Sequence, residues 1–185
     1  GSGNRGLTAT GVLTLPMKGK AQQRLDRGVA LFNKGQVAAA LKDFSAALAA
    51  GAGANTLYFR AMAWEALGKP RKALADLKAG LKAEPANHGM RLKAARLLYA
   101  GGKRAEALSE LKNVLRADPK SASARILLAR IHLEGKRPTA ARKELRAALK
   151  AESASAPLRA QAAELYADMG DVDAALEECR AGLRM

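Results

Sequence analysis

A glycine-containing turn recurs along this chain at a nearly constant interval. The turn glycines are Gly35, Gly68, Gly102, Gly135 and Gly170, and the successive spacings are 33, 34, 33 and 35 residues. A period near 34 is typical of repeat proteins, in which each repeat is one small supersecondary structure. The chain is therefore expected to be an array of similar units that stack on their neighbours.

Helices are expected on both sides of every turn. An alanine-rich segment such as "KALADLKAGLKA" follows each turn, and a segment of similar length with a 3.6-residue apolar period, such as "NTLYFRAMAWEAL", precedes it. Alanine is the best helix former, and β-branched residues are few. We predict five helix–turn–helix repeats over residues 21–53, 54–87, 88–121, 122–155 and 156–185, after an N-terminal extension of residues 1–20.

Four prolines are consistent with this division. Pro70 and Pro138 fall in the first turn of a predicted second helix, where the missing amide donor is not needed. Pro85 and Pro119 follow the last turn of such a helix, which proline cannot continue. Gly135 comes one residue early, so the sequence leaves the register of the fourth repeat's first helix open by one residue.

The second repeat carries the fullest pattern, with Ala61, Trp64, Gly68, Leu77 and Pro85 at characteristic positions. In these residues the chain resembles the tetratricopeptide-repeat family, and the resemblance extends over residues 21–185. It implies an all-α, right-handed superhelical solenoid without catalytic activity. It also implies a protein-binding adaptor or scaffold, whose partners lie in a concave groove lined by the first helices of successive repeats.

Groove-facing positions follow from the same resemblance. Tyrosine and arginine anchor many protein interfaces, and arginine can hold a carboxylate through two hydrogen bonds. We therefore expect a protein or peptide partner with acidic residues and apolar anchors. The groove positions are Leu25, Val29, Asn55, Tyr58, Met62, Leu92, Arg96, Tyr99, Ile126 and Arg130.

The charge distribution supports an alternative. The net charge is +15, with +5 in each of residues 88–121 and 122–155 and −3 in residues 156–185. A basic middle favours binding of nucleic acid or another anionic polymer. Aromatic residues make up only 4% of the chain, which leaves few side chains to stack on bases, so this alternative ranks second.

The sequence contains no recognisable catalytic or metal-binding constellation. Its histidines are His88, expected in a solvated loop, and His132, expected to be partly buried in packing. Its one cysteine, Cys179, falls on the apolar stripe of the last predicted helix and is expected to pack there. We predict no catalytic residue, cofactor or metal, and a third alternative is an enzyme subunit whose active site lies outside this chain.

Compartment and context stay open. No run of 18 apolar residues is present, so no membrane span is expected. The opening Gly-Ser-Gly is typical of a cloning remnant, so a native signal peptide or anchor would not appear in this sequence. The sequence is therefore compatible with either the bacterial periplasm or the cytoplasm. High alanine and arginine usage suggests a bacterial source and a role in envelope assembly, secretion or export. The abrupt end suggests a fragment of a longer protein, and an apolar edge at Leu183 and Met185 would suit further repeats or a second copy.

Overall fold

The computed structural model describes residues 9–150 and 155–184, with side chains from Gly19 onwards. Ten helices and no strands lie within these residues, as the sequence predicted for an all-α chain. The helices are α1 (Ala9–Asn33), α2 (Val37–Ala49), α3 (Ala54–Ala66), α4 (Pro70–Ala83), α5 (His88–Ala100), α6 (Arg104–Ala117), α7 (Ala122–Glu134), α8 (Pro138–Leu149), α9 (Ala156–Asp168) and α10 (Val172–Leu183).

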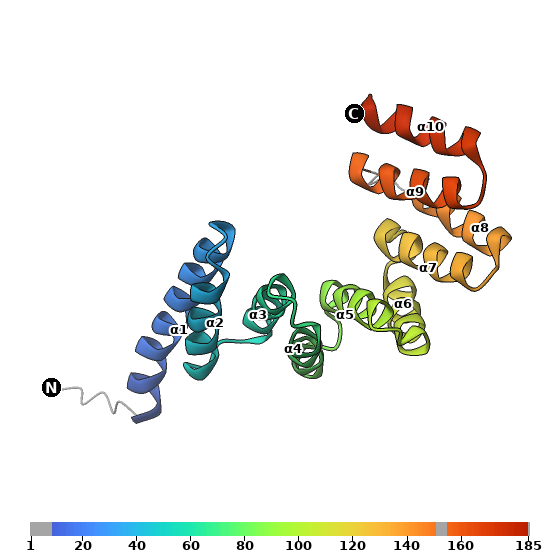
Figure 1. Ribbon diagram of the computed structural model, residues 1–185. Helices are drawn as coiled ribbons and strands as arrows, with labels where there is room; N and C mark the ends of the chain where they lie inside the picture. Colours follow the sequence, from blue (N-terminus) through green and yellow to red (C-terminus); the bar gives the residue numbers. More distant parts are fainter. Residues whose placement is uncertain (1–8, 151–154, 185) are drawn as a thin grey trace, which may run out of the picture. The chain divides into compact units, whose positions relative to one another are not determined.

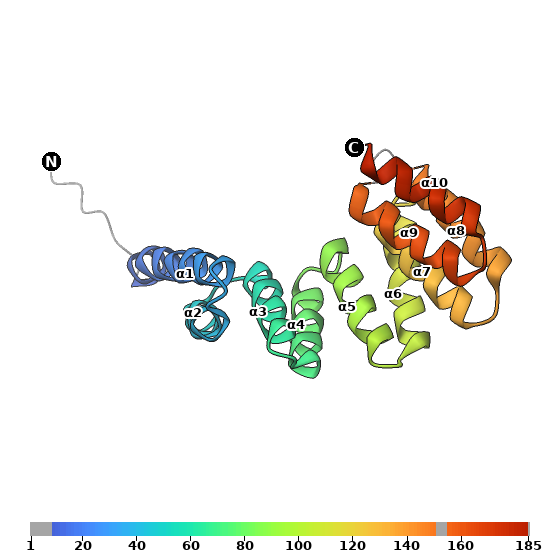
Figure 2. The same ribbon diagram turned by 45° about the horizontal axis from the view of Figure 1, so that its top comes forward.

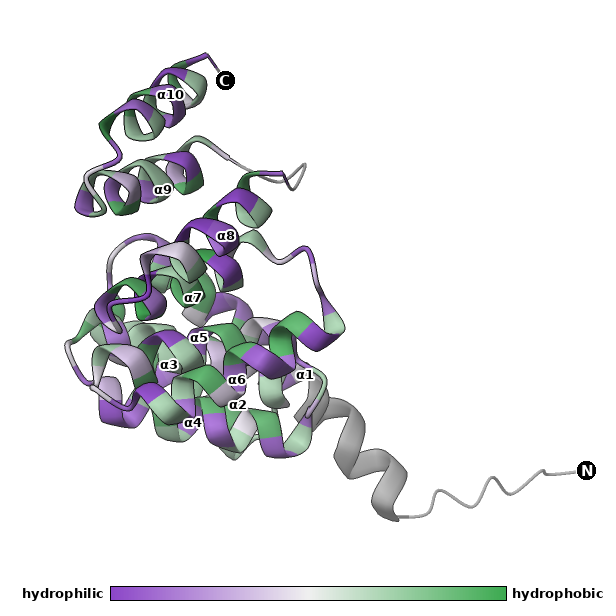
Figure 3. Cartoon of the chain, turned by 90° about the vertical axis from the view of Figure 1, so that its right-hand side faces the viewer, coloured by the Kyte–Doolittle hydropathy of each residue, from purple (hydrophilic) through white to green (hydrophobic). Residues whose placement is uncertain are grey.

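The chain divides into two compact blocks, each described here by itself. The N-terminal block is residues 1–90 and the C-terminal block is residues 91–185. Within the first, α1 packs against α2 and α3 against α4; within the second, α7 packs against α8 and α9 against α10 (Figures 1 and 2). Figure 3 shows hydrophobic and hydrophilic residues mixed along each helix, as expected for helices that bury one face.

The turn between the two helices of each repeat has one hydrogen-bond pattern. In the first, the amide of Gly35 donates to the carbonyl of Phe32 and that of Gln36 to the carbonyl of Leu31, both at 2.9 Å. This is a Schellman ending, which requires a left-handed residue after the helix. The left-handed residues of the five turns are Gly35, Gly68, Gly102, Lys136 and Gly170.

The fourth turn resolves the register that the sequence left open. Lys136 has φ +55° and occupies the left-handed position, whereas Gly135 has φ −77° and ends α7. The left-handed residues are thus 33, 34, 34 and 34 residues apart. The fourth repeat keeps the regular period, and its glycine lies one residue before the position that needs it.

The two helices of the first repeat approach closely at Gly28. A Cβ atom on Gly28 would lie 2.6 Å from Cε1 of Phe44, which is fully buried. The positions equivalent to Gly28 in the other repeats hold alanine, at Ala61, Ala95, Ala129 and Ala163. The positions equivalent to Phe44 hold smaller residues, Leu77, Leu111, Leu145 and Cys179. Among the five repeats, the first therefore has the smallest residue at this first-helix position and the largest at this second-helix position.

An arginine on the first helix of every repeat bonds a carboxylate on the second helix. The acidic position is the same in all five repeats. Both aspartates accept from an arginine 16 residues earlier, Asp43 also accepts from one 19 residues earlier, and the glutamates accept from one 19 residues earlier. The pairs are Arg24 and Arg27 with Asp43, Arg60 with Asp76 (2.7 Å), Arg91 with Glu110 (2.8 Å), Arg125 with Glu144 (2.6 Å) and Arg159 with Glu178 (2.6 Å).

Three local expectations differ from the structure. Cys179 is exposed rather than packed, because no later repeat among the described residues covers the last helix. His88 is the first residue of α5, after Asn87, whose side-chain oxygen accepts the Met90 amide at 3.0 Å. Residues 9–20 belong to α1 instead of an extension, and residues 1–8 and Met185 lie outside the described part.

Replacing Lys136 with glycine should stabilise the C-terminal block. A residue with a Cβ atom in the left-handed region costs about 1 kcal/mol, and glycine removes most of that cost. We expect a free energy of unfolding higher by about 0.5–1 kcal/mol for Lys136→Gly in urea titrations. Lys136→Ala keeps the Cβ atom and should not show the gain; an equal gain in both variants would contradict this account.

Gly28→Ala should destabilise the N-terminal block, since the added methyl meets the Phe44 ring. Overpacking of this kind costs about 1–3 kcal/mol. The double variant Gly28→Ala/Phe44→Leu recreates the alanine–leucine pair of the middle repeats and should recover much of that loss. Unfolding free energies of the two single variants and the double variant would test this, and strictly additive effects would rule out the compensation.

Asp43 should make the stability of the N-terminal block depend on pH. The hydrogen bond from Arg27 lowers the pKa of the buried Asp43 carboxyl, and Arg24 acts in the same direction. The stabilisation is complete above the unfolded pKa of about 3.9 and is lost as pH falls through the lower folded pKa. Between about pH 5 and pH 3, the wild-type chain should lose more unfolding free energy than Asp43→Asn. If the unfolding free energies of the wild-type chain and of Asp43→Asn fell equally with pH, this account would be contradicted.

Candidate functional site

Five of the predicted groove residues lie in the N-terminal block. Leu25 is buried in its core, and Val29 is half-buried against the same core, so these two contribute mainly to packing. Asn55 is exposed, while Tyr58 and Met62 are half-buried on α3. The Tyr58 ring also meets the neighbouring Phe59 ring edge-on, with centroids 6.0 Å apart.

The other five lie in the C-terminal block, where the structure brings four of them together. Arg96 and Tyr99 from α5 and Ile126 and Arg130 from α7 line one hollow of about 170 Å³. Ser123, Leu127 and Gln161 complete its walls. We call this site the groove hollow. It is formed by residues of the first helices of three successive repeats, α5, α7 and α9.

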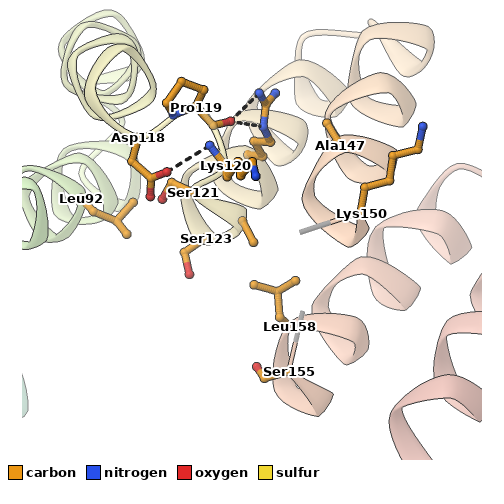
Figure 4. A pocket seen from close by; sticks show the side chains of 12 residues that line it. Leu92, Asp118, Pro119, Lys120, Ser121, Ser123, Ala147, Lys150, Ser155 and Leu158 are labelled. Carbon is orange, nitrogen blue, oxygen red and sulfur yellow. Dashed lines mark hydrogen bonds between the residues drawn. The ribbon is translucent and has the colours of Figure 1, made fainter. Parts of the chain in front are cut away.

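Leu92 lines a different and larger hollow of about 790 Å³ (Figure 4). This hollow lies beside the start of α7 and the start of α9, and Ser123 lines both hollows. Arg125 is not available to a ligand there, because its guanidinium donates to the Pro119 carbonyl and bonds Glu144. The exposed Lys120 and Lys150 give this hollow its positive charge.

Two of the four predicted residues at the groove hollow are already bonded to a carboxylate of the following repeat. Arg130 bonds Glu164 of α9 at 3.1 Å. The hydroxyl of Tyr99 donates to Glu134 at the end of α7, and Arg104 bonds the same carboxylate. Burial, followed by this hydrogen bond to Glu134, raises the pKa of Tyr99 to about 12, so its phenol stays protonated and acts as a donor.

Arg96 differs from Arg130 in its surroundings. Its side chain is exposed, and no ion pair to it lies within residues 9–150 and 155–184. The groove hollow therefore offers one arginine open to solvent and one paired with an exposed glutamate. Ile126 and Leu127 supply an apolar floor between them. Such a site suits a ligand group with a carboxylate beside an apolar side chain.

Glu134 and Glu164 were not recognised as partners of groove residues from the sequence. The signal that could have found them is their spacing: Glu134 follows Tyr99 by 35 residues and Glu164 follows Arg130 by 34. A separation of one repeat places two side chains on corresponding faces of adjacent first helices. An arginine and a glutamate at that separation can therefore pair, as Arg130 and Glu164 do.

No group of three or more histidine, cysteine, aspartate or glutamate residues is placed to hold a metal ion in the described part of the chain. His132 is half-buried on α7, as expected. Among the helices described, none combines the length and the apolar character that crossing a bilayer requires.

Several solved structures are similar to this chain. A thermophilic tetratricopeptide-repeat protein of Thermus thermophilus is 27% identical, with a TM-score of 0.74, covering 89% of this chain and 90% of that one. MamA of Desulfovibrio magneticus RS-1 is 17% identical, with a TM-score of 0.72, covering 89% and 94%. A chain of an APC/C hetero-tetramer is 16% identical, with a TM-score of 0.78, covering 91% of this chain and 34% of that one.

The sequence itself gives the family. No curated protein matched the chain. A family model described as tetratricopeptide repeat matches residues 25–88 and 92–157, which is more than half of the 185 residues. The fold expected from the resemblance, an all-α superhelix of helical hairpins, is confirmed. This chain belongs to the tetratricopeptide-repeat family.

Proposed function

We propose that this chain is a non-catalytic scaffold that binds a segment of a partner protein at the groove hollow. The tetratricopeptide-repeat fold is a protein-interaction fold, and this is the coarse function that the family supports. The finer proposal rests on one observation: Arg96, Tyr99, Ile126 and Arg130 converge on one hollow from two first helices.

The chemistry of the groove hollow indicates the partner. A carboxylate of the partner would bond Arg96, whose guanidinium is exposed, and an apolar side chain beside it would cover Ile126 and Leu127. The mixed character is typical of an interface in which a few aromatic and arginine side chains dominate the affinity. We therefore propose an acidic peptide with apolar anchors.

Glu164 gives the site an internal competitor. It bonds Arg130 and is 59% exposed, so it can turn away into solvent at small cost. A partner carboxylate would displace Glu164 from Arg130 while it binds Arg96. Glu134 is held more firmly, since both Tyr99 and Arg104 bond it. Arg96 and Arg130 thus form the anion-binding pair, and Glu164 weakens binding modestly because it competes for Arg130.

Selection from a random peptide library displayed on phage would test the groove. The wild-type chain should enrich peptides with a carboxylate next to apolar residues. Their affinity, measured by fluorescence anisotropy, should fall at least about tenfold in Arg96→Glu/Arg130→Glu and rise a few-fold in Glu164→Gln.

The matched control reverses two positive charges elsewhere in the C-terminal block. Lys112→Glu/Lys143→Glu replaces exposed lysines on α6 and α8 and should leave peptide affinity within about twofold. Equal losses in both double variants would mean that only net charge matters. If instead single-stranded DNA bound with an affinity that falls steeply with salt, the anionic-polymer alternative would replace this proposal. A role in envelope assembly, secretion or export stays a prediction.

A further inference from the structure

The last helix carries a row of exposed apolar side chains. Val172 is 61% exposed, Leu176 47% and Leu183 88%, and Cys179 is exposed between them. Their spacings of 4, 3 and 4 residues place all four along one face of α10, which packs against α9 with its other face. We call this row the α10 stripe; Figures 1 and 3 show that α10 is the last helix of the chain, beyond α9.

The repeats before it bury the residue at the Cys179 position and bury or half-bury those at the Leu176 and Leu183 positions. The positions equivalent to Cys179 are Phe44, Leu77, Leu111 and Leu145, all fully buried. The first helix of the following repeat provides cover in two clear cases: the Phe44 ring stacks with Phe59, and Leu145 shares a core with Leu158 and Ala162 of α9. The middle of the α10 stripe therefore corresponds to the surface that forms the junction between repeats, here without a neighbour in the described chain.

A row of charges runs beside the stripe. Asp173, Glu177, Arg180 and Arg184 line one side of a hollow of about 430 Å³ on α10, and all four are exposed. No ion pair involving any of them lies within the part of the chain that the structure describes. We call this row the charged flank. Its first half is acidic and its second half is basic.

This order of charges is complementary to itself in one orientation. When two identical helices pack antiparallel, each flank faces the same flank of the other copy in reverse order. Asp173 then lies opposite Arg184 of the second copy, and Glu177 lies opposite Arg180. In a parallel arrangement, the two flanks would lie on opposite sides of the helix pair and would not meet. Complementary charges therefore favour the antiparallel arrangement.

At the other end of the chain, the exposed positions on the described part of α1 include several polar residues. On the described part of α1, Gln22, Gln23 and Asp26 are exposed while Ala21 and Leu25 are buried. At these positions, head-to-tail stacking would place the α10 stripe against polar side chains. A contact between two copies of α10 instead buries apolar side chains on both.

We infer that two copies of this chain associate through antiparallel α10 helices to form a symmetric dimer. The α10 stripes pack on each other, and the charged flanks form two Asp173–Arg184 and two Glu177–Arg180 pairs. The same patch serves both copies, so the association closes at two and does not grow into fibres. This surface is separate from the groove hollow, so the inference does not depend on the proposed function.

Sedimentation equilibrium over a wide range of protein concentration tests the association. The wild-type chain should show a monomer–dimer equilibrium that weakens as salt is added. Leu176→Lys/Leu183→Lys should weaken dimerisation at least tenfold, while the α6–α8 control Lys112→Glu/Lys143→Glu should not change it. A chain that stays monomeric at every concentration, or a dimer unaffected by the leucine variants, would overturn the inference.

Charge reversal tests the orientation. Arg180→Glu/Arg184→Glu and Asp173→Arg/Glu177→Arg should each dimerise poorly alone but form a heterodimer when mixed. The quadruple variant with all four charges reversed is again self-complementary in the antiparallel orientation and should regain the wild-type dimer. Failure of both the mixture and the quadruple variant, with circular dichroism showing intact helices, would overturn the antiparallel arrangement.

Cys179 provides a distance probe. It lies near the middle of the α10 stripe, so the antiparallel dimer brings the two Cys179 side chains close to the symmetry axis. A short bis-maleimide should cross-link the wild-type chain and the quadruple variant at concentrations where both are dimeric. It should not cross-link Cys179→Ser or Leu176→Lys/Leu183→Lys. Absence of cross-linking in a wild-type dimer would contradict the α10 interface.

Discussion

Close contact between the two helices of each repeat is the constraint on which the rest of the structure depends. A small residue on the first helix faces a large residue on the second, and Gly28 with Phe44 is the tightest example. Helices this close can carry a first-helix arginine within reach of a second-helix carboxylate. The same approach fixes the turn, since only a left-handed residue ends one helix and starts the next in so short a space.

The ion pairs change the meaning of the strongly basic composition. Arginines in every repeat are bonded to carboxylates of the same hairpin, and several more bond carboxylates of the next repeat. These arginines contribute net charge, yet their donors are directed toward the protein. The cationic groups best placed for a ligand are consequently few, and Arg96 at the groove hollow is one of them. Charge counted along a sequence does not reveal this division.

The period, the helix class and the small-residue positions could be predicted from the sequence because each depends on local residue type. Pro70 and Pro138 begin α4 and α8, as expected from the geometry of proline alone. Burial at Leu25 and Cys179 could not be predicted so well, because it depends on which neighbours cover a helix face. The bonds of Glu134 to Tyr99 and of Glu164 to Arg130 were not predicted for a related reason: they join different repeats. At the fourth turn, the regular spacing of 34 residues predicts the left-handed position, Lys136, correctly. The position of Gly135 would have placed it one residue too early.

The position of α10 has a consequence for how the chain unfolds. In a repeat array, each hairpin is stabilised by its own interactions and by those with its neighbours, so a terminal hairpin lacks one set. The helix pair α9–α10 is held on one side only within the described chain, and fraying is expected to begin at α10 and move inward. The side chains that make α10 a suitable contact surface are thus the same ones that make it the least protected segment against local opening.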